Sequence, residues 1–401
     1  MSAPAAPGLA LLGGTPVRSS MLPYGRQEIT DADIAAVTEV LRSAWLTTGP
    51  NVARFEEACA ARVGASHAIA VNNGTAALHA AMHALSIGPG DEVIVPAMTF
   101  AASANCVVYQ GGTPVFADVD PDTLLVDPAS IEARLTPRTK AIVAVDYAGQ
   151  PCDYAALLPL AERHNLPIVA DGCHALGGAW RGQPVGSITT LTTFSFHPVK
   201  HITTGEGGLI STNDEALAAR MRVFRNHGIT SDHRQREAQG GFFYEMVDLG
   251  FNYRLTDVQC ALGVSQISRL DEFIARRRAI AAQYDRAFAG MAEVQPLGRV
   301  ADTEHAYHLY VVQLEIEMLS ADRGEMFSAL RAENIGANVH YVPVHLHPFY
   351  KQRFGTARGL CPAAEHAYER LLSLPMFPGM SDDDVADVIA AVGKVVGHYR
   401  R

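Results

Sequence analysis

The sequence predicts an α/β protein with a mostly parallel sheet and a smaller α+β lobe toward its C-terminal end. Between residues 68 and 226, short apolar runs alternate with segments of helical periodicity, which is typical of parallel strands joined by helices. After residue 256, long helical patterns are interrupted by only two strand-like runs. A chain of 401 residues is also longer than one core usually serves, which favours two lobes.

Seven apolar runs are the strand candidates of the first lobe. Several are rich in β-branched residues without polar alternation, as expected for strands that are covered on both faces. They lie at residues 68–71, 92–95, 114–117, 141–145, 167–170, 191–195 and 208–211. We expect helices between them. Before the first strand, Thr30 is placed to cap a helix that runs to about residue 42.

A helical pattern from residue 256 to 289, ending at Gly290, is expected to link the lobes. Four elements should follow in the small lobe: strands at residues 306–314 and 337–341, and helices at residues 321–334 and from 381 onward. We therefore expect three parts: an N-terminal arm at residues 1–25, a large domain at 26–260, and a linking helix with a small domain at 261–401.

The composition argues against several classes of protein. With a net charge of −10 and no long run of lysine or arginine, the chain lacks the basic patch expected for binding nucleic acid or an anionic membrane. Its six cysteines show neither the spacing of a zinc site nor a disulfide framework, so we expect no metal and a reducing cytoplasm. The first 14 residues lack a basic leader and no later run reaches about 20 apolar residues, so we expect no signal peptide and no membrane span.

The first of four motifs, Asn72-Asn73-Gly74-Thr75-Ala76, follows a strand and opens a helix. Gly74 lets the backbone approach a ligand closely. The free N–H groups of the first helical turn and the hydroxyl of Thr75 can then hold a phosphate. An ordinary strand-to-helix turn with Thr75 as its cap remains an alternative on this motif alone.

The second motif, Pro96-Ala97-Met98-Thr99-Phe100, stands at the end of another strand. Ligands of α/β folds bind at the carboxyl ends of the strands, where Phe100 can stack on a planar ring. Because aromatic residues also dominate protein cores, a core position for Phe100 is the alternative.

The third motif runs from Ile168 to Gly177 and contains Asp171 and His174. A carboxylate at the end of an apolar strand is costly to bury unless a cation pairs with it. A protonated pyridine nitrogen would serve Asp171 as that partner, and the pairing would keep the ring electron-poor. His174 can hydrogen-bond a ring oxygen of such a cofactor or a group of the substrate. The alternatives are that Asp171 caps a helix and that His174 is a core histidine.

The fourth motif is the most specific: Ser195-Phe196-His197-Pro198-Val199-Lys200, followed by the glycine-rich run Thr204-Gly205-Glu206-Gly207-Gly208. Lys200 leaves a strand into a polar turn, which is a good place to present an amine for Schiff-base chemistry. Ser195 can give a further hydroxyl to a phosphate. The alternative, a surface lysine, is weakened by Asp171 and by the phosphate motif.

In this order the four motifs resemble those of the DegT/DnrJ/StrS family of sugar aminotransferases, which depend on pyridoxal 5'-phosphate (PLP). The resemblance covers nearly the whole chain, from Leu46-Thr47-Thr48-Gly49-Pro50 to the last lobe. It implies a PLP-dependent fold of type I, in which Lys200 binds the cofactor covalently and Asp171 pairs with its pyridine nitrogen. Phe100 would stack on the ring, and Gly74, Thr75 and Ser195 would hold the phosphate.

The segment Gly250-Phe251-Asn252-Tyr253-Arg254 resembles the loop with which this family crosses a dimer interface. The resemblance therefore implies a homodimer with shared active sites, in which Asn252 and Arg254 reach the phosphate region of the neighbouring subunit. By its chemistry alone, Arg254 near a helix start would more often be a surface residue.

Within the family, the sequence resembles the aminotransferase of pseudaminic acid biosynthesis. The motifs that carry this resemblance are His197-Pro198-Val199-Lys200, His308-Leu309-Tyr310 and Val339-His340-Tyr341-Val342-Pro343-Val344. It implies a UDP-linked 4-keto-6-deoxy-N-acetylhexosamine as substrate, with His308, Tyr310, His340 and Tyr341 in contact with it. The sequence departs from this subgroup at His201, where we expect proline.

The resemblance also implies a reaction in two halves. Glutamate would convert PLP to pyridoxamine phosphate, which then aminates C4 of the sugar, with Lys200, Asp171 and His174 as the catalytic residues. A dTDP- or GDP-linked 3- or 4-keto-6-deoxyhexose is the alternative substrate. A sugar dehydratase of the same fold carries histidine at the lysine position, so Lys200 argues against it. A non-catalytic regulatory protein is the remaining alternative, because a fold alone does not establish activity.

Overall fold

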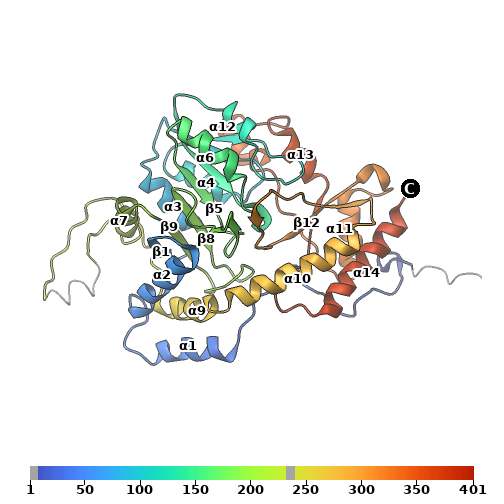
Figure 1. Cartoon of the computed structure of the whole chain (residues 1–401), viewed down its shortest axis with the longest axis horizontal. Helices are drawn as coiled ribbons and strands as arrows, with labels where there is room; N and C mark the ends of the chain where they lie inside the picture. The colour runs from blue at the N-terminus through green and yellow to red at the C-terminus, as the bar shows by residue number, and fades with distance from the viewer. Residues whose placement is uncertain (1–7, 232–239) are drawn as a thin grey trace, which may run out of the picture.

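The computed structural model describes residues 8–231 and 240–401. At its centre is a seven-stranded sheet with the strand order β1-β9-β8-β5-β4-β2-β3 (Figure 1). The strands are β1 (His67–Val71), β2 (Glu92–Pro96), β3 (Thr113–Ala117), β4 (Thr139–Val145), β5 (Ile168–Asp171), β8 (Leu191–Ser195) and β9 (Gly208–Thr212). Each of the seven predicted strands is therefore present.

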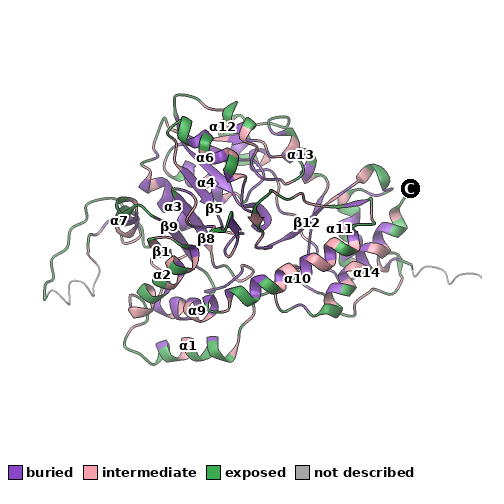
Figure 2. Ribbon diagram, viewed as in Figure 1, coloured by how far each residue is buried: buried purple, intermediate pink, exposed green. Residues whose placement is uncertain are grey.

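The sheet is parallel from β8 through β3, and only β9 runs antiparallel to its two neighbours. This confirms the predicted α/β class with a mostly parallel sheet. Strands β2 and β5 are buried along their whole length, and four of the five residues of β8 are buried, which explains why the sequence shows apolar runs without alternation (Figure 2).

The helices of this half precede the first strand, lie between the strands or, in the case of α7, follow the last one. They are α1 (Asp31–Leu41), α2 (Pro50–Val63), α3 (Gly74–Ala84), α4 (Ala102–Tyr109), α5 (Pro128–Glu132), α6 (Tyr154–Arg163) and α7 (Glu215–Phe224). The predicted cap is present, since the backbone N–H of Thr30 donates to Asp33 in a capping box. Two short strands, β6 (Ala179–Trp180) and β7 (Gln183–Pro184), form a small sheet with β11 (Thr303–Glu304) in the order β11-β6-β7.

The predicted single helix at residues 256–289 is two helices, α9 (Asp257–Ile267) and α10 (Leu270–Phe288). The break falls at Arg269, whose ψ is 5° and whose N–H donates to the carbonyl of Gln266, three residues earlier. Figure 1 shows the two helices running end to end from beneath the main sheet to the C-terminal helices α11 (Arg323–Ala332) and α14 (Asp382–Tyr399).

The second sheet has three strands, β10 (Val294–Pro296), β12 (Tyr310–Leu314) and β13 (Leu371–Leu374). Two short helices, α12 (Pro348–Phe354) and α13 (Pro362–Tyr368), precede β13. The helices predicted at 321–334 and from 381 are confirmed as α11 and α14, and Ser381 caps the latter.

Of the two strands predicted in the C-terminal half, one is shorter than expected and the other is absent. The strand predicted at 306–314 begins only at Tyr310, because the N–H groups of Ala306 and Leu309 donate to Gly149 and Ala148 beside the main sheet instead. The strand predicted at 337–341 is absent, and only Asn338 makes a single bridge, to Ser373. Both segments lead from the small sheet to the strand ends of the large one.

The apolar core has a large cluster around the main sheet and a second cluster around the small one. Val344 and Tyr350 from the C-terminal half pack in the first cluster, so the two lobes share buried surface. The predicted domain boundary near residue 260 falls within α9, and the division into three parts stays a prediction. Across the described residues, no helix combines the length and apolar character needed to cross a bilayer.

Candidate active site

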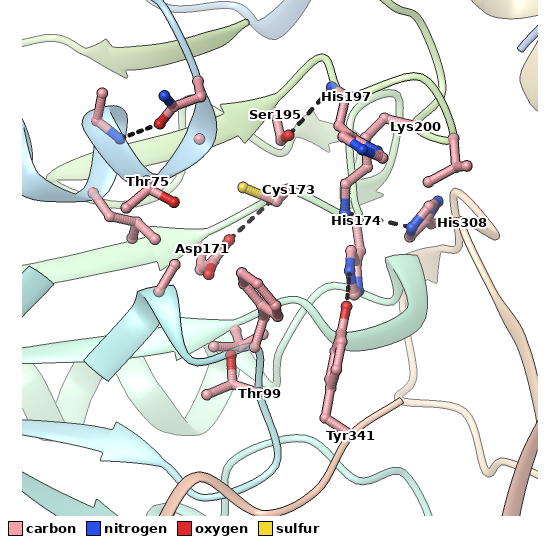
Figure 3. Close-up of a pocket in the computed structure, with 18 of the residues that line it drawn as sticks. Thr75, Thr99, Asp171, Cys173, His174, Ser195, His197, Lys200, His308 and Tyr341 are labelled. Atoms are coloured by element: carbon pink, nitrogen blue, oxygen red, sulfur yellow. Dashed lines mark hydrogen bonds between the residues drawn. The ribbon is translucent and has the colours of Figure 1, made fainter. Parts of the chain in front are cut away.

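A cavity of about 790 Å³ opens at the carboxyl ends of β5 and β8, next to the N-terminus of α3 (Figure 3). This is the edge of the sheet where α/β proteins bind their ligands, and the volume lies within the usual range for small-molecule sites. Ten of the residues predicted from the sequence line the cavity: Gly74, Thr75, Phe100, Asp171, His174, Ser195, Lys200, His308, His340 and Tyr341.

The first turn of α3 forms one end of the cavity. Asn73 caps this helix, its side chain accepting the N–H of Ala76 at 2.8 Å, so the cap is Asn73 and not Thr75. A Cβ added at Gly74 would lie 3.0 Å from Cβ of Ser195 and 3.3 Å from the sulfur of Cys173. Glycine therefore lets β8 and α3 approach closely, and the helix end with Thr75 and Ser195 presents the donors that a phosphate needs.

Asp171 ends β5 and faces the cavity with both carboxylate oxygens accepting hydrogen bonds. One oxygen accepts the Ser103 hydroxyl at 2.6 Å, and the other accepts the backbone N–H of Cys173 at 3.2 Å. The alternative that Asp171 caps a helix is excluded, because no helix follows it within residues 172–178. These bonds fix the carboxylate while it remains buried.

Lys200 lies in the turn after β8, partly buried, with its amine 3.4 Å from Nε2 of His308. Burial lowers the pKa of Lys200, the nearby Cys173 and Asp171 oppose this, and the charge of Arg277 lowers it further. A lowered pKa favours the neutral amine, which is the nucleophilic form.

His174, His308 and Tyr341 form a cluster beside this amine (Figure 3). The Tyr341 hydroxyl lies 3.0 Å from Nε2 of His174, and the rings of His174 and His308 have centroids 4.5 Å apart. Burial holds the pKa of both histidines well below 6.5, and the charge of Lys200 lowers both further. Both imidazoles are therefore neutral at physiological pH and can donate or accept a proton within the site.

Two further predicted residues stand at the rim of this cluster. Phe100 is 58% exposed, which excludes the alternative of a core aromatic, and its ring centroid lies 5.8 Å from that of Tyr341. Nδ1 of His340 lies 2.8 Å from the Ser373 hydroxyl, and burial lowers the pKa of His340 to about 4. His340 is thus tied to β13 and lines the cavity as a neutral ring.

Three predicted residues do not line this cavity. Tyr310 points from β12 into the second core, where its hydroxyl donates to Asp285 at 2.8 Å. Arg254 donates to Asn226 at 2.8 Å and lines a separate cavity of about 440 Å³, and Asn252 is exposed beside it. The structure of one chain thus gives Tyr310 no access to the cavity and leaves Arg254 and Asn252 outside it.

The structure also adds residues that the sequence analysis missed. Ser103 holds Asp171 and in turn lies 2.7 Å from the Thr99 hydroxyl. The only local signal was the spacing of Thr99 and Ser103, which places them one helical turn apart. Tyr24 and Tyr253 line the cavity from remote parts of the chain, and no local pattern indicated them.

His201, where the sequence departs from the subgroup, is buried behind Lys200. Its Nε2 donates to the carbonyl oxygen of Ala306 at 3.1 Å. This bond ties the turn that carries Lys200 to the segment that carries His308. With histidine instead of proline at position 201, Lys200 still lines the cavity.

Comparisons with known proteins agree with this geometry. The model of the DegT/DnrJ/EryC1/StrS aminotransferase family matches residues 27–393. The chain is 45% identical over 381 residues to the spore coat polysaccharide biosynthesis protein SpsC of Bacillus subtilis (strain 168), a match that covers 94% of this chain and 98% of SpsC.

Two solved structures extend the likeness to three dimensions. Spr1654 from Streptococcus pneumoniae, in its PMP form, has a TM-score of 0.89 and 33% identity, covering 94% of this chain and 99% of that one. Helicobacter pylori PseC, an aminotransferase involved in the biosynthesis of pseudoaminic acid, has a TM-score of 0.88 and 32% identity, covering 95% and 100%. Spr1654 is also known in a PLP form.

The cavity fits PLP on the evidence of its own residues. The close approach at Gly74 shapes a helix end for the phosphate. At the other end of the site, Asp171 offers a buried carboxylate to a pyridinium nitrogen, and Lys200 offers an amine whose pKa is lowered. With its fold, its site and these relatives, the chain belongs to the DegT/DnrJ/EryC1/StrS aminotransferase family and is a PLP-dependent sugar aminotransferase.

Proposed function

We propose that this enzyme transfers the amino group of glutamate to C4 of a UDP-linked 4-keto-6-deoxy-N-acetylhexosamine. The observation that carries the proposal is His174, which lines the cavity with Lys200 and lies 3.0 Å from the Tyr341 hydroxyl. The family resemblance implies glutamine at this position in members that aminate C3, so His174 favours C4. The resemblance of residues 197–200 and 339–344 to the pseudaminic acid enzyme supports it, and so does the match to PseC over 95% of the chain.

The cofactor, when bound, supplies the carbonyl that takes up the amino group and an electron-poor ring that stabilises a carbanion. Lys200 anchors it and, once released, carries the proton between Cα of glutamate, or C4 of the sugar, and the cofactor. The lowered pKa of Lys200 suits both roles, because each needs a neutral amine at physiological pH. One residue thus serves as both anchor and base.

The other residues bind and orient. Gly74, Thr75 and Ser195 hold the phosphate, Phe100 stacks on the ring, and Asp171 keeps the pyridine nitrogen protonated. His308, His340 and Tyr341, which line the same cavity, contact the sugar. Their neutral or hydroxyl donors suit the hydroxyl and amide groups of an N-acetylated sugar.

The substrate assignment predicts a clear order of specificity constants. Among UDP-, dTDP- and GDP-linked 3-keto and 4-keto sugars, the UDP-linked 4-keto-6-deoxy-N-acetylhexosamine should give a kcat/KM roughly tenfold or more above the others, because buried polar groups discriminate between substrates that do and do not match them. Mass spectrometry of the products, with glutamate as donor, identifies the aminated sugar. A higher kcat/KM for a dTDP-linked sugar would overturn the substrate and leave the aminotransferase unchanged.

We further propose that the active unit is a homodimer. Arg254 and Asn252 lie outside the cavity of their own chain, which is expected if they complete the phosphate site of a neighbour. Between α7 and α9, the described residues from 240 to 249 lie away from the body (Figure 1) and include exposed large apolar side chains, with Phe242 91% and Leu249 72% exposed. A second copy would remove these side chains from water.

Mixing two inactive variants tests the shared site. A chain with Lys200→Ala and a chain with Arg254→Ala should together regain about a quarter of the wild-type activity, since about half of the dimers are mixed and one of the two sites in each is intact. The control replaces the second chain with one that carries both substitutions, which leaves no intact site. If no activity returns although subunit exchange is demonstrated, the shared site is refuted.

A further inference from the structure

Arg277 is a buried charge in the middle of an apolar helix face. The buried residues of α10 recur every three or four positions, as Leu270, Phe273, Ile274, Arg277, Ile280, Ala281, Tyr284 and Phe288. All of them except Arg277 are apolar or aromatic, and Arg277 is 0% exposed. A buried guanidinium costs free energy that a leucine at the same place would not. Its presence therefore calls for an explanation other than packing.

The guanidinium of Arg277 binds main-chain oxygens instead of a carboxylate. Its Nη1 donates to the carbonyl oxygens of Tyr307, His308 and Met376 at 3.1, 3.2 and 3.0 Å. Within residues 8–231 and 240–401, no carboxylate forms an ion pair with it, and its Nε and Nη2 are buried without a hydrogen-bond partner. Arg277 thus ties α10 to the segment before β12 and to the segment after β13.

The first of these segments carries His308, whose Nε2 lies 3.4 Å from the amine of Lys200. In the described part of the chain, the other ring nitrogen of His308, Nδ1, is buried without a hydrogen-bond partner. The place of this ring is therefore set by its backbone and by packing against the rings of His174 and His201. The backbone is what Arg277 holds.

We propose that Arg277 is a positioning residue, which clamps the chain at Tyr307 and His308 and so holds the His308 imidazole against the amine of Lys200. This proposal rests on the role proposed for Lys200 as the residue that binds the cofactor. Arg277 does not line the cavity, so it acts through these two residues and not on the substrate.

The charge of Arg277 adds to its effect as a clamp. Asp171 and Cys173 face Lys200 from the end of β5 and raise its pKa, while burial and Arg277 lower it. His174, His201 and His308 surround the same amine, and burial keeps the pKa of each well below 6.5. Arg277 is the positive charge that reaches Lys200 and His308 together from α10. Burial lowers its own pKa to about 9, which leaves it charged at neutral pH.

The experiment measures how fast the full-length apoenzyme captures PLP, followed by the absorbance of the cofactor as a function of pH. Capture needs the neutral amine, so the rate rises with pH until Lys200 is deprotonated. Without the positive charge the pKa of Lys200 rises, so Arg277→Met should shift the rising part of this rate profile to higher pH and slow capture at pH 7. Arg277→Lys keeps the charge, so its rate of PLP capture should rise over nearly the same pH range as that of the wild type.

Arg278→Met is the matched control. Arg278 is the next residue of α10 and also holds this segment, since its Nε donates to the carbonyl of His305 at 3.0 Å. Its side chain is partly exposed and pairs with Glu304, and the charges that shift the pKa of Lys200 and of His308 include Arg277 but not Arg278. If Arg277 had a purely structural role, both methionine variants would be less stable, and neither would change the pH dependence of PLP capture.

A folded Arg277→Met enzyme whose rate of PLP capture depends on pH as that of the wild type does would overturn the proposal. If that variant does not fold, Arg277→Gln removes the charge while keeping two donors, and an unchanged pH dependence is again decisive. If neither neutral variant folds, Arg277→Lys decides, because the lysine side chain ends one atom short of Nη1 and its ammonium cannot meet all three carbonyl oxygens together. We then expect kcat to fall with KM unchanged, and an unchanged kcat overturns the clamp. PLP capture does not involve the sugar, so the test remains valid even if the proposed substrate is wrong. A wild-type apoenzyme that captures no PLP would instead contradict the role of Lys200.

Discussion

Replacing Lys200 with alanine should remove covalent cofactor binding and lower kcat/KM by roughly 10⁴-fold or more. A positioned general base alone contributes about 10²–10⁴-fold, and this lysine is proposed to be the anchor as well as the base. No other amine takes its place, because the chain has only four lysines and Lys140, Lys351 and Lys394 do not line the cavity. PLP should still bind weakly through the donors at the start of α3.

Borohydride reduction of the holoenzyme followed by peptide mapping measures this directly. The pyridoxyl group should be found on the peptide that contains Lys200. Lys140→Ala is the matched control, since this lysine is exposed on β4 and its loss should change neither the label nor the rate. A label on Lys140, Lys351 or Lys394, or a Lys200→Ala enzyme that still turns over, would contradict the assignment.

The main sheet could be predicted because buried parallel strands have an unmistakable sequence. In β5, three apolar residues are followed by Asp171, so one run of letters gives both the strand and the functional group at its end. The same holds for β8, which ends at Ser195 just before the lysine turn. These motifs lie at the edge of the sheet where the strand ends meet, and the cavity is found there.

The C-terminal half was harder to predict from the sequence, because hydrophobic periodicity shows which residues are buried but not which segments they pack against. Residues 306–309 read as strand, yet Ala306 and Leu309 donate their N–H groups to the turn at residues 148–149. Tyr310 begins the true strand and its side chain faces the second core, whereas His308 faces the cavity. His308 and Tyr310 belong to one sequence motif but face different parts of the molecule, and only the tertiary structure shows this.

The residues that support the site were the least predictable. Ser103 reaches Asp171 from helix α4, and Tyr24 reaches the cavity from the N-terminal segment. Arg277 did leave a signal, because a charged residue interrupts an otherwise apolar stripe of α10. A stripe broken in this way indicates a buried polar contact, but its acceptors at Tyr307, His308 and Met376 cannot be read from the sequence.

The second large effect is expected at the other end of the cofactor site. Asp171→Asn should retain much of its PLP but lose roughly a hundredfold or more in kcat/KM, because losing an electrostatic partner of the transition state typically costs a few kcal/mol. The substitution keeps the shape of the side chain, so the contacts with Ser103 and the Cys173 N–H can persist in altered form. What it removes is the negative charge that keeps the pyridine nitrogen protonated.

Asp146→Asn is the matched control for this charge. Asp146 follows β4, next to Asp171, whose carbonyl accepts its backbone N–H. Burial raises the pKa of Asp146 to about 7, and its Oδ1 accepts the Cys152 N–H and the Tyr154 hydroxyl, bonds that an asparagine oxygen can also accept. Its replacement should therefore leave kcat/KM within a few-fold of the wild type. Steady-state rates normalised to bound PLP compare the two variants, and an Asp171→Asn enzyme as active as Asp146→Asn would show that the proposed pairing with the ring nitrogen does not drive the reaction.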